Sequence, residues 1–151
     1  MVSQSKSTEN NENEDIDLSI LVSIIRFNDQ ILTEENKLLS IWGMTVLQYN
    51  ALQVIYENDV EKVGLSSREI GKGLNTRVSD ITRLLDRLAD KKWVIRERDE
   101  ENRRVVRTRL TPIGRELVKS ASPSLKELRV KLLEGLSQSE KIEIAGFFRK
   151  L

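Results

Sequence analysis

Hydrophobic residues recur along most of this chain at the spacing of amphipathic helices. In the first run, which covers residues 16–31, large apolar side chains return at steps of three or four. Similar runs begin near residues 45, 66, 75, 112 and 137. Such steps place apolar side chains on one face of a helix, so the pattern predicts six helices. The first stripe is wide, which indicates burial against more than one neighbour, such as a second subunit.

The predicted helices carry recognisable start signals. Three of them begin with a capping box, in which Ser or Thr is followed three residues later by Gln or Glu. These boxes are Thr45 with Gln48, Ser66 with Glu69, and Ser137 with Glu140. Thr111 followed by Pro112 also predicts a helix start, because proline fits the first helical position. Pro123 is expected to kink or split that helix, since it removes a backbone hydrogen bond.

Between residues 93 and 110 the hydrophobic period changes from helical to alternating. Two alternating segments flank a polar, turn-like stretch at residues 99–103, which predicts a β-hairpin. Two short helices followed by a basic hairpin are typical of a winged helix-turn-helix. We therefore expect a mainly α fold with a small β-hairpin wing (an α+β protein), flanked by helices at both ends.

Composition narrows the classes of function. The chain has 151 residues and contains neither cysteine nor histidine. Disulfides and thiolate metal sites are thereby excluded, and the commonest general base and metal ligand is missing. No site motif of an enzyme is visible, so we expect no catalytic activity and no cofactor. Charged and amide residues interrupt the apolar run 16–31, so it cannot span a bilayer, and a cytoplasmic protein is the default expectation.

The net charge of +1 conceals a segregation of charge. Residues 66–109 contain 13 Lys and Arg but eight Asp and Glu, whereas the rest of the chain contains 12 and 16. The basic surplus therefore lies in the part whose pattern predicts the winged helix. Such a surplus favours a nucleic acid as partner, although a solvated surface is the alternative explanation.

The predicted helix 75–91 has one dry face and one face of hydrogen-bonding groups. A recognition helix needs short polar and basic side chains that reach base edges in the major groove. Arginine can donate to both acceptors of guanine, and aspartate can accept from cytosine or hold a neighbouring arginine. The candidate base-reading residues are Arg77, Ser79, Asp80 and Arg83. The alternative is an ordinary surface helix of mixed charge.

The hairpin tip offers Arg103 and Arg104 beside Asn102. An arginine guanidinium fits a narrow minor groove and is attracted by its negative potential. We expect Arg104 to be inserted and Arg103 to contact the DNA backbone. A solvated turn is the alternative, because the acids at 99–101 would repel phosphates unless they pair with arginines. Lys91 and Lys92, at the end of the recognition helix, suit phosphates or the helix dipole.

Several of these motifs together resemble the MarR family of bacterial transcriptional regulators. The motifs are residues 81–88 (ITRLLDRL) followed by Trp93-Val94, then Arg103-Arg104, then residues 110–114 (LTPIG). The resemblance extends over residues 16–151 in helix order. It implies a homodimer whose first and last helices intertwine, with two winged domains on an inverted repeat. It also implies regulation by small, often aromatic or phenolic anions.

Two positions depart from the family pattern. The family usually has Asp two residues before the wing arginine, where this chain has Asn102. An Asp–Arg pair that orders the wing is therefore not expected, although asparagine can still form hydrogen bonds. The family also favours Gly after the recognition helix, where this chain has Lys92. A left-handed residue other than Gly costs about 1 kcal/mol, so this helix is expected to end differently.

Ligand contacts in related salicylate-responsive proteins match Thr82, Arg87 and Arg96. A hydroxyl and two guanidiniums suit a carboxylate. Arg87 and Arg96 could equally form surface ion pairs. Trp42 and Tyr49 could line a pocket between the DNA-binding and dimer parts, or belong to the core. The lack of cysteine excludes sensing by thiol oxidation.

Together these features predict a disordered tail at 1–15 and one MarR-like domain at 16–151. Residues 45–111 would form the winged helix, and 16–40 and 112–151 the dimerisation helices. The predicted function is sequence-specific binding of double-stranded DNA by a homodimeric repressor, at a palindromic operator, with release by a small anionic aromatic ligand. The alternative is a winged-helix module that binds another protein.

Overall fold

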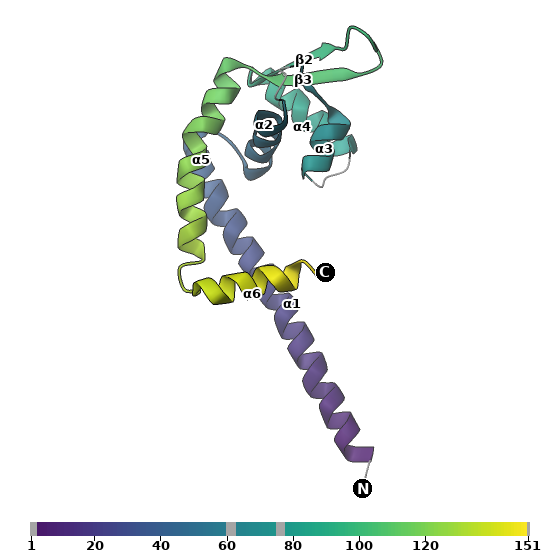
Figure 1. The fold of residues 1–151 in the computed structure, drawn as a ribbon, viewed down its shortest axis with the longest axis vertical. Coiled ribbons are helices and arrows are strands. Elements are labelled where there is room, and N and C mark those ends of the chain that lie inside the picture. Colours follow the sequence, from purple (N-terminus) through teal and green to yellow (C-terminus); the bar gives the residue numbers. More distant parts are fainter. Residues whose placement is uncertain (1–2, 60–62, 75–77, 151) are drawn as a thin grey trace.

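A lobe of short helices and a small sheet lies at one end of two long helices in the computed structural model (Figure 1). The structure describes residues 3–59, 63–74 and 78–150, and the side chains of 15–59, 63–74 and 80–150. The helices are α1 (Ser3–Leu39), the 3-10 helix η1 (Ser40–Trp42), α2 (Val46–Asn58), α3 (Ser67–Leu74), α4 (Val78–Asp90), α5 (Pro112–Leu132) and α6 (Gln138–Phe148). The strands are β1 (Leu65–Ser66), β2 (Val94–Arg98) and β3 (Val106–Leu110). The predicted α+β fold class is thus confirmed.

The predicted capping boxes are present. The Thr45 hydroxyl accepts a hydrogen bond from the Gln48 N–H, and the Gln48 side chain accepts one from the Thr45 N–H. The same reciprocal bonds join Ser66 with Glu69 and Ser137 with Glu140. Each box satisfies backbone donors that a helix start would otherwise leave unpaired.

Two helices differ from expectation. α1 begins at Ser3, so most of the segment predicted as a tail continues this helix. Extending a helix that already exists requires no new nucleation, which favours the longer form. α5 runs through Pro123 without being split. Ala121 and Leu125 are buried on either side of the proline, and their packing compensates for one missing hydrogen bond.

The sheet contains a short strand that alternation did not reveal. β3 lies in the middle, with β1 and β2 antiparallel on its two sides. In the predicted hairpin, Val94 pairs with Leu110 and Arg98 with Val106. Strand β1 places Leu65 opposite Thr108, directly before α3. The wing is therefore joined to the first helix of the helix-turn-helix.

The core lies within the lobe and along the upper part of α5. Helices α2, α4 and α5 contribute most of its side chains, which are Val46, Tyr49, Ala51, Leu52, Ile55, Ile81, Leu84, Leu85, Leu88, Val118, Ala121 and Leu125. Helix α5 begins against the carbonyl oxygen of Trp93, which accepts hydrogen bonds from the Thr111 N–H and hydroxyl at 3.0 and 3.1 Å. A Cβ atom at Gly114 would lie 2.0 Å from the same oxygen. This junction fixes α5 to the lobe.

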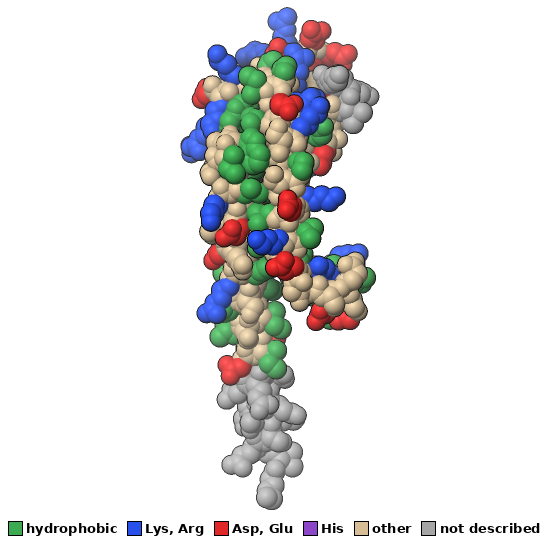
Figure 2. All heavy atoms as spheres, turned by 90° about the vertical axis from the view of Figure 1, so that its left-hand side faces the viewer, with side chains coloured by type: hydrophobic (Ala, Val, Ile, Leu, Met, Phe, Trp, Pro, Cys, Tyr) green, Lys and Arg blue, Asp and Glu red, His purple; other side chains and the backbone are tan. Residues whose placement is uncertain are grey.

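Large apolar side chains remain exposed on α1 and α6. Ile25 is 60% exposed and Phe147 is 61% exposed. Figure 2 shows hydrophobic side chains on both sides of the part of α1 that extends beyond α6. In the described part of the chain, no single helix is long and apolar enough to cross a membrane. One pair of helices, 15–42 and 46–58, passes that test only when joined across its 73° bend.

Candidate nucleic-acid interface

Helix α4 separates a buried face from an exposed polar face, as predicted for a recognition helix. Ile81, Leu85 and Leu88 are completely buried on one side. On the other side, Asp80 and Arg83 are exposed. Because the buried face is locked into the core, the exposed face has a defined orientation on the lobe.

The structure describes two of the four predicted base-reading residues completely. Among the described residues, neither Asp80 nor Arg83 takes part in an ion pair. Their side chains are therefore available to a partner. Ser79 lies on the first turn of α4, but its side chain lies outside the described residues, and Arg77 lies outside them altogether.

Arg103 and Arg104 are exposed at the tip of the hairpin. The tip is an ordered turn, because Asp99 Oδ1 accepts hydrogen bonds from the N–H groups of Glu101 and Asn102 at 3.0 and 2.8 Å. The Asn102 side-chain oxygen accepts one from the Arg104 N–H at 3.2 Å. Asparagine thus holds the backbone beside Arg104 without a carboxylate at position 102.

Arg107 connects the tip of the wing to its base. Its Nε donates to Asp99 Oδ2 at 2.7 Å, and its Nη1 donates to the Gly64 carbonyl at 3.3 Å. The same Nη1 lies 3.7 Å from the Glu69 carboxylate in α3. Arg107 therefore joins the hairpin turn, the entry to β1 and the cap of α3. Sequence reasoning missed this residue, although an arginine and an aspartate flanking a predicted turn are a signal for such a pair.

The charged groups of Arg107, Asp99 and Glu69 lie close enough to attract one another. The hydrogen bond from Arg107 holds the pKa of Asp99 below its ordinary value, with a further contribution from the Asn102 N–H. The same carboxylate raises the pKa of Arg107. Hydrogen bonds from Ser66 lower the pKa of Glu69. All three groups are charged at neutral pH, and the Asp99 carboxylate is directed at Arg107.

The recognition helix is followed by a left-handed residue, the conformation that glycine usually adopts at this position. The expectation that the helix would end differently was therefore wrong. Lys92 has a left-handed backbone, with φ of 59°. Its N–H bonds to the Ala89 carbonyl at 2.8 Å, and the Trp93 N–H bonds to the Leu88 carbonyl at 3.0 Å. This pair of bonds is a Schellman motif. The two bonds and the position of Trp93 at the α5 junction outweigh the strain of about 1 kcal/mol at Lys92.

The predicted effector residues have different surroundings in the described structure. Thr82 and Arg87 are exposed on α4. Arg96 on β2 forms an ion pair with Asp86, and its side chain is only 18% exposed. The alternative that the sequence left open, an ion pair, therefore applies to Arg96.

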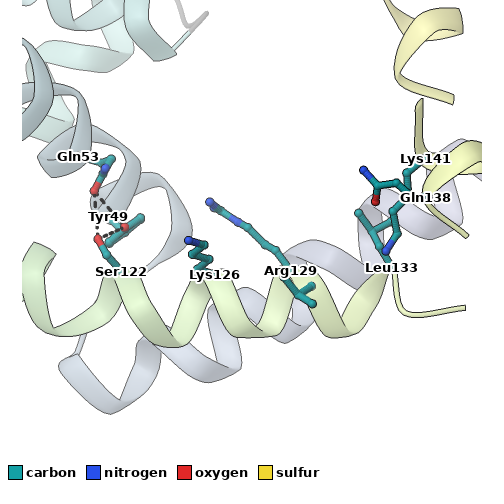
Figure 3. A pocket seen from close by; sticks show the side chains of 9 residues that line it. Tyr49, Gln53, Ser122, Lys126, Arg129, Leu133, Gln138 and Lys141 are labelled. Carbon is teal, nitrogen blue, oxygen red and sulfur yellow. Dashed lines mark hydrogen bonds between the residues drawn. The ribbon is translucent and has the colours of Figure 1, made fainter. Parts of the chain in front are cut away.

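A separate cleft of about 550 Å³ lies between α2, α5 and α6. The Tyr49 hydroxyl, Ser122 and Gln53 form a hydrogen-bonded group at one end, and Gln138 and Lys141 lie at the other (Figure 3). Two further cations, Lys126 and Arg129, line the middle of the cleft. Of the two predicted aromatic lining residues, Tyr49 contributes to this cleft, whereas Trp42 packs against the core.

Arg129 is shared between the cleft and a buried acid. Its Nε donates to Glu35 Oε1 at 2.7 Å, and Glu35 is buried on α1. This pair joins the two long helices. Lys126 and Lys141 have no ion-pair partner among the described residues, so the cleft carries an excess of positive charge.

Comparisons with known proteins agree with this arrangement. The family model of the MarR family matches residues 42–105. The transcriptional repressor MprA of Escherichia coli K12 is 24% identical over 127 residues, which cover 84% of this chain and 71% of MprA. A MarR mutant from E. coli, solved with operator DNA, superposes with a TM-score of 0.78 and 26% identity over 91% of this chain and 95% of its own.

A third similar protein is BpsR of Bordetella bronchiseptica, whose DNA binding is regulated by 6-hydroxynicotinic acid. Its structure has a TM-score of 0.76 and 20% identity, and the match covers 87% of this chain and 97% of BpsR. The lobe, its capped helices and its wing define a winged helix-turn-helix protein. The family match at residues 42–105, the repressor relative and the operator-bound neighbour together support a MarR-family transcriptional regulator.

Proposed function

We propose that the protein is a homodimeric transcriptional repressor that binds an inverted-repeat operator in double-stranded DNA. One observation carries the proposal: the lobe presents the exposed Arg83 on a helix whose other face is buried, and an arginine pair at the tip of an ordered wing. A helix in the major groove and a wing over the flanking minor groove need this combination. The operator-bound MarR neighbour supports it.

In this proposal the two parts of the site have different tasks. Base edges in the major groove are read by Arg77, Ser79, Asp80 and Arg83. Arg104 enters the minor groove, and Arg103 contacts the DNA backbone. Major-groove contacts distinguish all four base pairs, whereas minor-groove contacts respond mainly to groove width.

The exposed apolar side chains on α1 and α6 support a dimer. Soluble monomers rarely leave such patches uncovered, and a second copy of these helices would bury them. Phe147→Glu is therefore expected to shift the protein toward the monomer in analytical ultracentrifugation. Leu47→Glu is the matched control, because Leu47 is 46% exposed on α2 of the lobe. A stable monomer in the unmodified protein would contradict the dimer.

DNA binding is tested by its dependence on salt. Duplexes recovered by the protein from a random-sequence library would be titrated at several KCl concentrations by fluorescence anisotropy. The logarithm of the association constant should fall linearly with log[salt], with a slope of about −0.9 for each phosphate contact. Recovery of no duplex, or a flat salt dependence, would favour the alternative in which the winged helix binds a protein.

We further propose that a small aromatic anion releases the repressor from DNA. BpsR provides the precedent in an aromatic carboxylic acid. The cleft beside Tyr49 offers two lysines that have no ion-pair partner among the described residues, whereas Arg96 of the predicted Thr82–Arg87–Arg96 set is already paired with Asp86. The cleft is accordingly the site that we favour.

Salicylate and 6-hydroxynicotinic acid are suitable probes of this site. Release from DNA by either compound should be weakened at least several-fold in Lys126→Met and unchanged in Lys119→Met. Lys119 is the matched control, because it is exposed on the same helix outside the cleft. If Arg87→Met abolishes release and Lys126→Met does not, the effector site lies on α4 instead.

A further inference from the structure

Lys91 follows the recognition helix α4, and its ammonium group connects that helix to the long helices. Its Nζ donates a hydrogen bond to the Gly43 carbonyl at 2.9 Å. The same Nζ lies 4.2 Å from the centre of the Trp93 ring, which is the distance of a cation–π interaction. Both contacts direct the charge toward the protein, whereas a phosphate contact needs it free.

The acceptor at Gly43 is held rigidly. Gly43 has a left-handed backbone, with φ of 65°, directly after η1. Its N–H bonds to the Ser40 carbonyl at 2.9 Å, and the Met44 N–H bonds to the Leu39 carbonyl at 3.2 Å. Leu39 and Met44 are both buried. The turn between α1 and α2 is therefore a fixed point for Lys91.

The second contact of Lys91 is with Trp93, which is itself fixed to the start of α5. Its carbonyl holds the start of α5 through Thr111, and the missing side chain at Gly114 allows the close approach. Lys91 thus reaches the end of α1 through Gly43 and the start of α5 through Trp93. Helix α1 carries exposed apolar side chains on which the proposed dimer depends, and α5 leads to α6, which carries the others.

We propose that Lys91 is a positioning residue for the recognition helix. It holds the end of α4 against the α1–α2 turn, so that the dimer helices determine the distance between the two recognition helices. The proposal rests on the proposed dimer and on its DNA binding. It also replaces the sequence-based expectation that Lys91 neutralises a phosphate or the helix dipole.

Lys92 provides a matched control. It is the neighbouring lysine, it is exposed, and no side-chain partner of it occurs among the described residues. Lys91→Met and Lys92→Met change the net charge equally and keep a long unbranched side chain. Lys91→Arg is the rescue variant, because a guanidinium retains both the hydrogen-bond donors and the cation–π contact.

The test uses the full-length protein and two inverted half-sites taken from duplexes selected by the unmodified protein. The number of base pairs between the half-sites is varied in single steps, and each Kd is measured across a range of KCl. Lys91→Met is expected to bind the best spacing five- to twenty-fold more weakly, to discriminate less between spacings, and to keep the unmodified salt slope. Lys91→Arg should restore the discrimination, and Lys92→Met should leave it intact.

A different result would overturn the proposal. If Lys91→Met makes the salt slope shallower by about 0.9 per subunit and keeps the spacing preference, the residue is a phosphate contact. If it changes neither quantity, the contact has no role. If the unmodified protein binds no duplex, the proposed function itself fails, and amide hydrogen exchange at Met44 and Trp93 then tests the link. Unchanged exchange in Lys91→Met would reject the link as well.

Discussion

Asp99 and Arg107 close the base of the wing: Arg107 Nε donates to Asp99 Oδ2 at 2.7 Å across the hairpin. Asp99 also accepts two backbone hydrogen bonds from the turn, so a single carboxylate orders the tip and ties it to β3. The remaining donors of Arg107 reach Gly64 and Glu69. An Asp–Arg pair therefore does order this wing, contrary to the expectation from Asn102, but it joins Asp99 to Arg107 and does not involve residue 102 and Arg104.

Removal of this support should loosen the wing and weaken DNA binding. In Arg107→Met, the amides of Glu101 and Asn102 are expected to exchange faster, because their acceptor loses its main partner. The affinity for a selected operator should fall several-fold. Arg109→Met is the control, because Arg109 lies on the same strand and pairs with Glu97 at 2.5 Å, outside the turn. Equal effects of both variants would contradict a specific role of Arg107.

The Asp99 contribution should depend on pH in a defined direction. Arg107 and the Asn102 N–H lower the pKa of Asp99, so the folded form is favoured at every pH above the unfolded pKa. That contribution is lost as the pH falls through the lowered value. Protection of the Glu101 and Asn102 amides should stay constant from neutral pH to about pH 5 and decrease below about pH 4.

The variant Asp99→Asn distinguishes the titration of Asp99 from that of the other acids near Arg107. Glu69 and Glu101 also act on the guanidinium, and the pKa of Glu69 is itself lowered by Ser66. The variant should have low protection at neutral pH and little further change on acidification. If it keeps the acid-dependent loss, another carboxylate is responsible.

Arg83 should contribute to sequence preference. Arg83→Ala is expected to cost about 1–3 kcal/mol on the selected operator and much less on unrelated DNA, because a base contact exists only at the correct base. Anisotropy titrations on both duplexes measure the difference. Thr82→Ala, an exposed neighbour on the same helix, serves as control. An equal loss on both duplexes would identify Arg83 as a phosphate contact.

Local rules predicted most elements of the fold from the sequence. Caps such as Thr45 with Gln48 depend on residues three positions apart, and the buried face of α4 depends on helical spacing. Both the capping pairs and the helical spacing can be recognised from residues that are close together in the sequence. Strand β1 spans only two residues, which is too short for an alternating pattern to be visible.

The features that were missed depend on contacts between distant segments. Arg107 meets Gly64 and Asp99 only when the hairpin register and β1 are both in place. Lys92 takes a left-handed conformation because Trp93 is held at the α5 junction, which outweighs local preference. Helix periodicity was enough to place Arg83 on the exposed face of α4. The cleft between α2, α5 and α6 could not be predicted, because it forms only when three separate segments pack together.

Gly114 should be essential for the joint between lobe and long helices. In Gly114→Ala, the new Cβ would lie 2.0 Å from the Trp93 carbonyl oxygen, which already accepts two hydrogen bonds from Thr111. Backbone must move, and we expect a loss of at least about 1–3 kcal/mol in the free energy of unfolding. Urea denaturation measures it. Gly146→Ala, with open space around the added Cβ, should be neutral or slightly stabilising.

Arg104 should respond to the shape of the DNA beside the recognised bases. The Asn102 side chain holds the Arg104 N–H, so the arginine leaves an ordered turn. A narrow minor groove, as in A-tracts, attracts an inserted guanidinium more strongly than a wide one. Arg104→Ala should therefore lose most affinity on operators with A/T-rich flanks and least on those with G/C-rich flanks. Arg103→Ala, assigned to the DNA backbone, should lose similar affinity on both.

These two variants can be compared on one set of duplexes. The set keeps the half-sites of the selected operator and changes only the flanks under each wing. The loss for Arg104→Ala should grow with A/T content, and the salt slope should change by similar amounts for both variants, because each removes one positive charge per wing. If Arg104→Ala is indifferent to the flanks while Arg103→Ala is sensitive to them, the inserted residue is Arg103, and the turn held by Asn102 presents its neighbour to the groove.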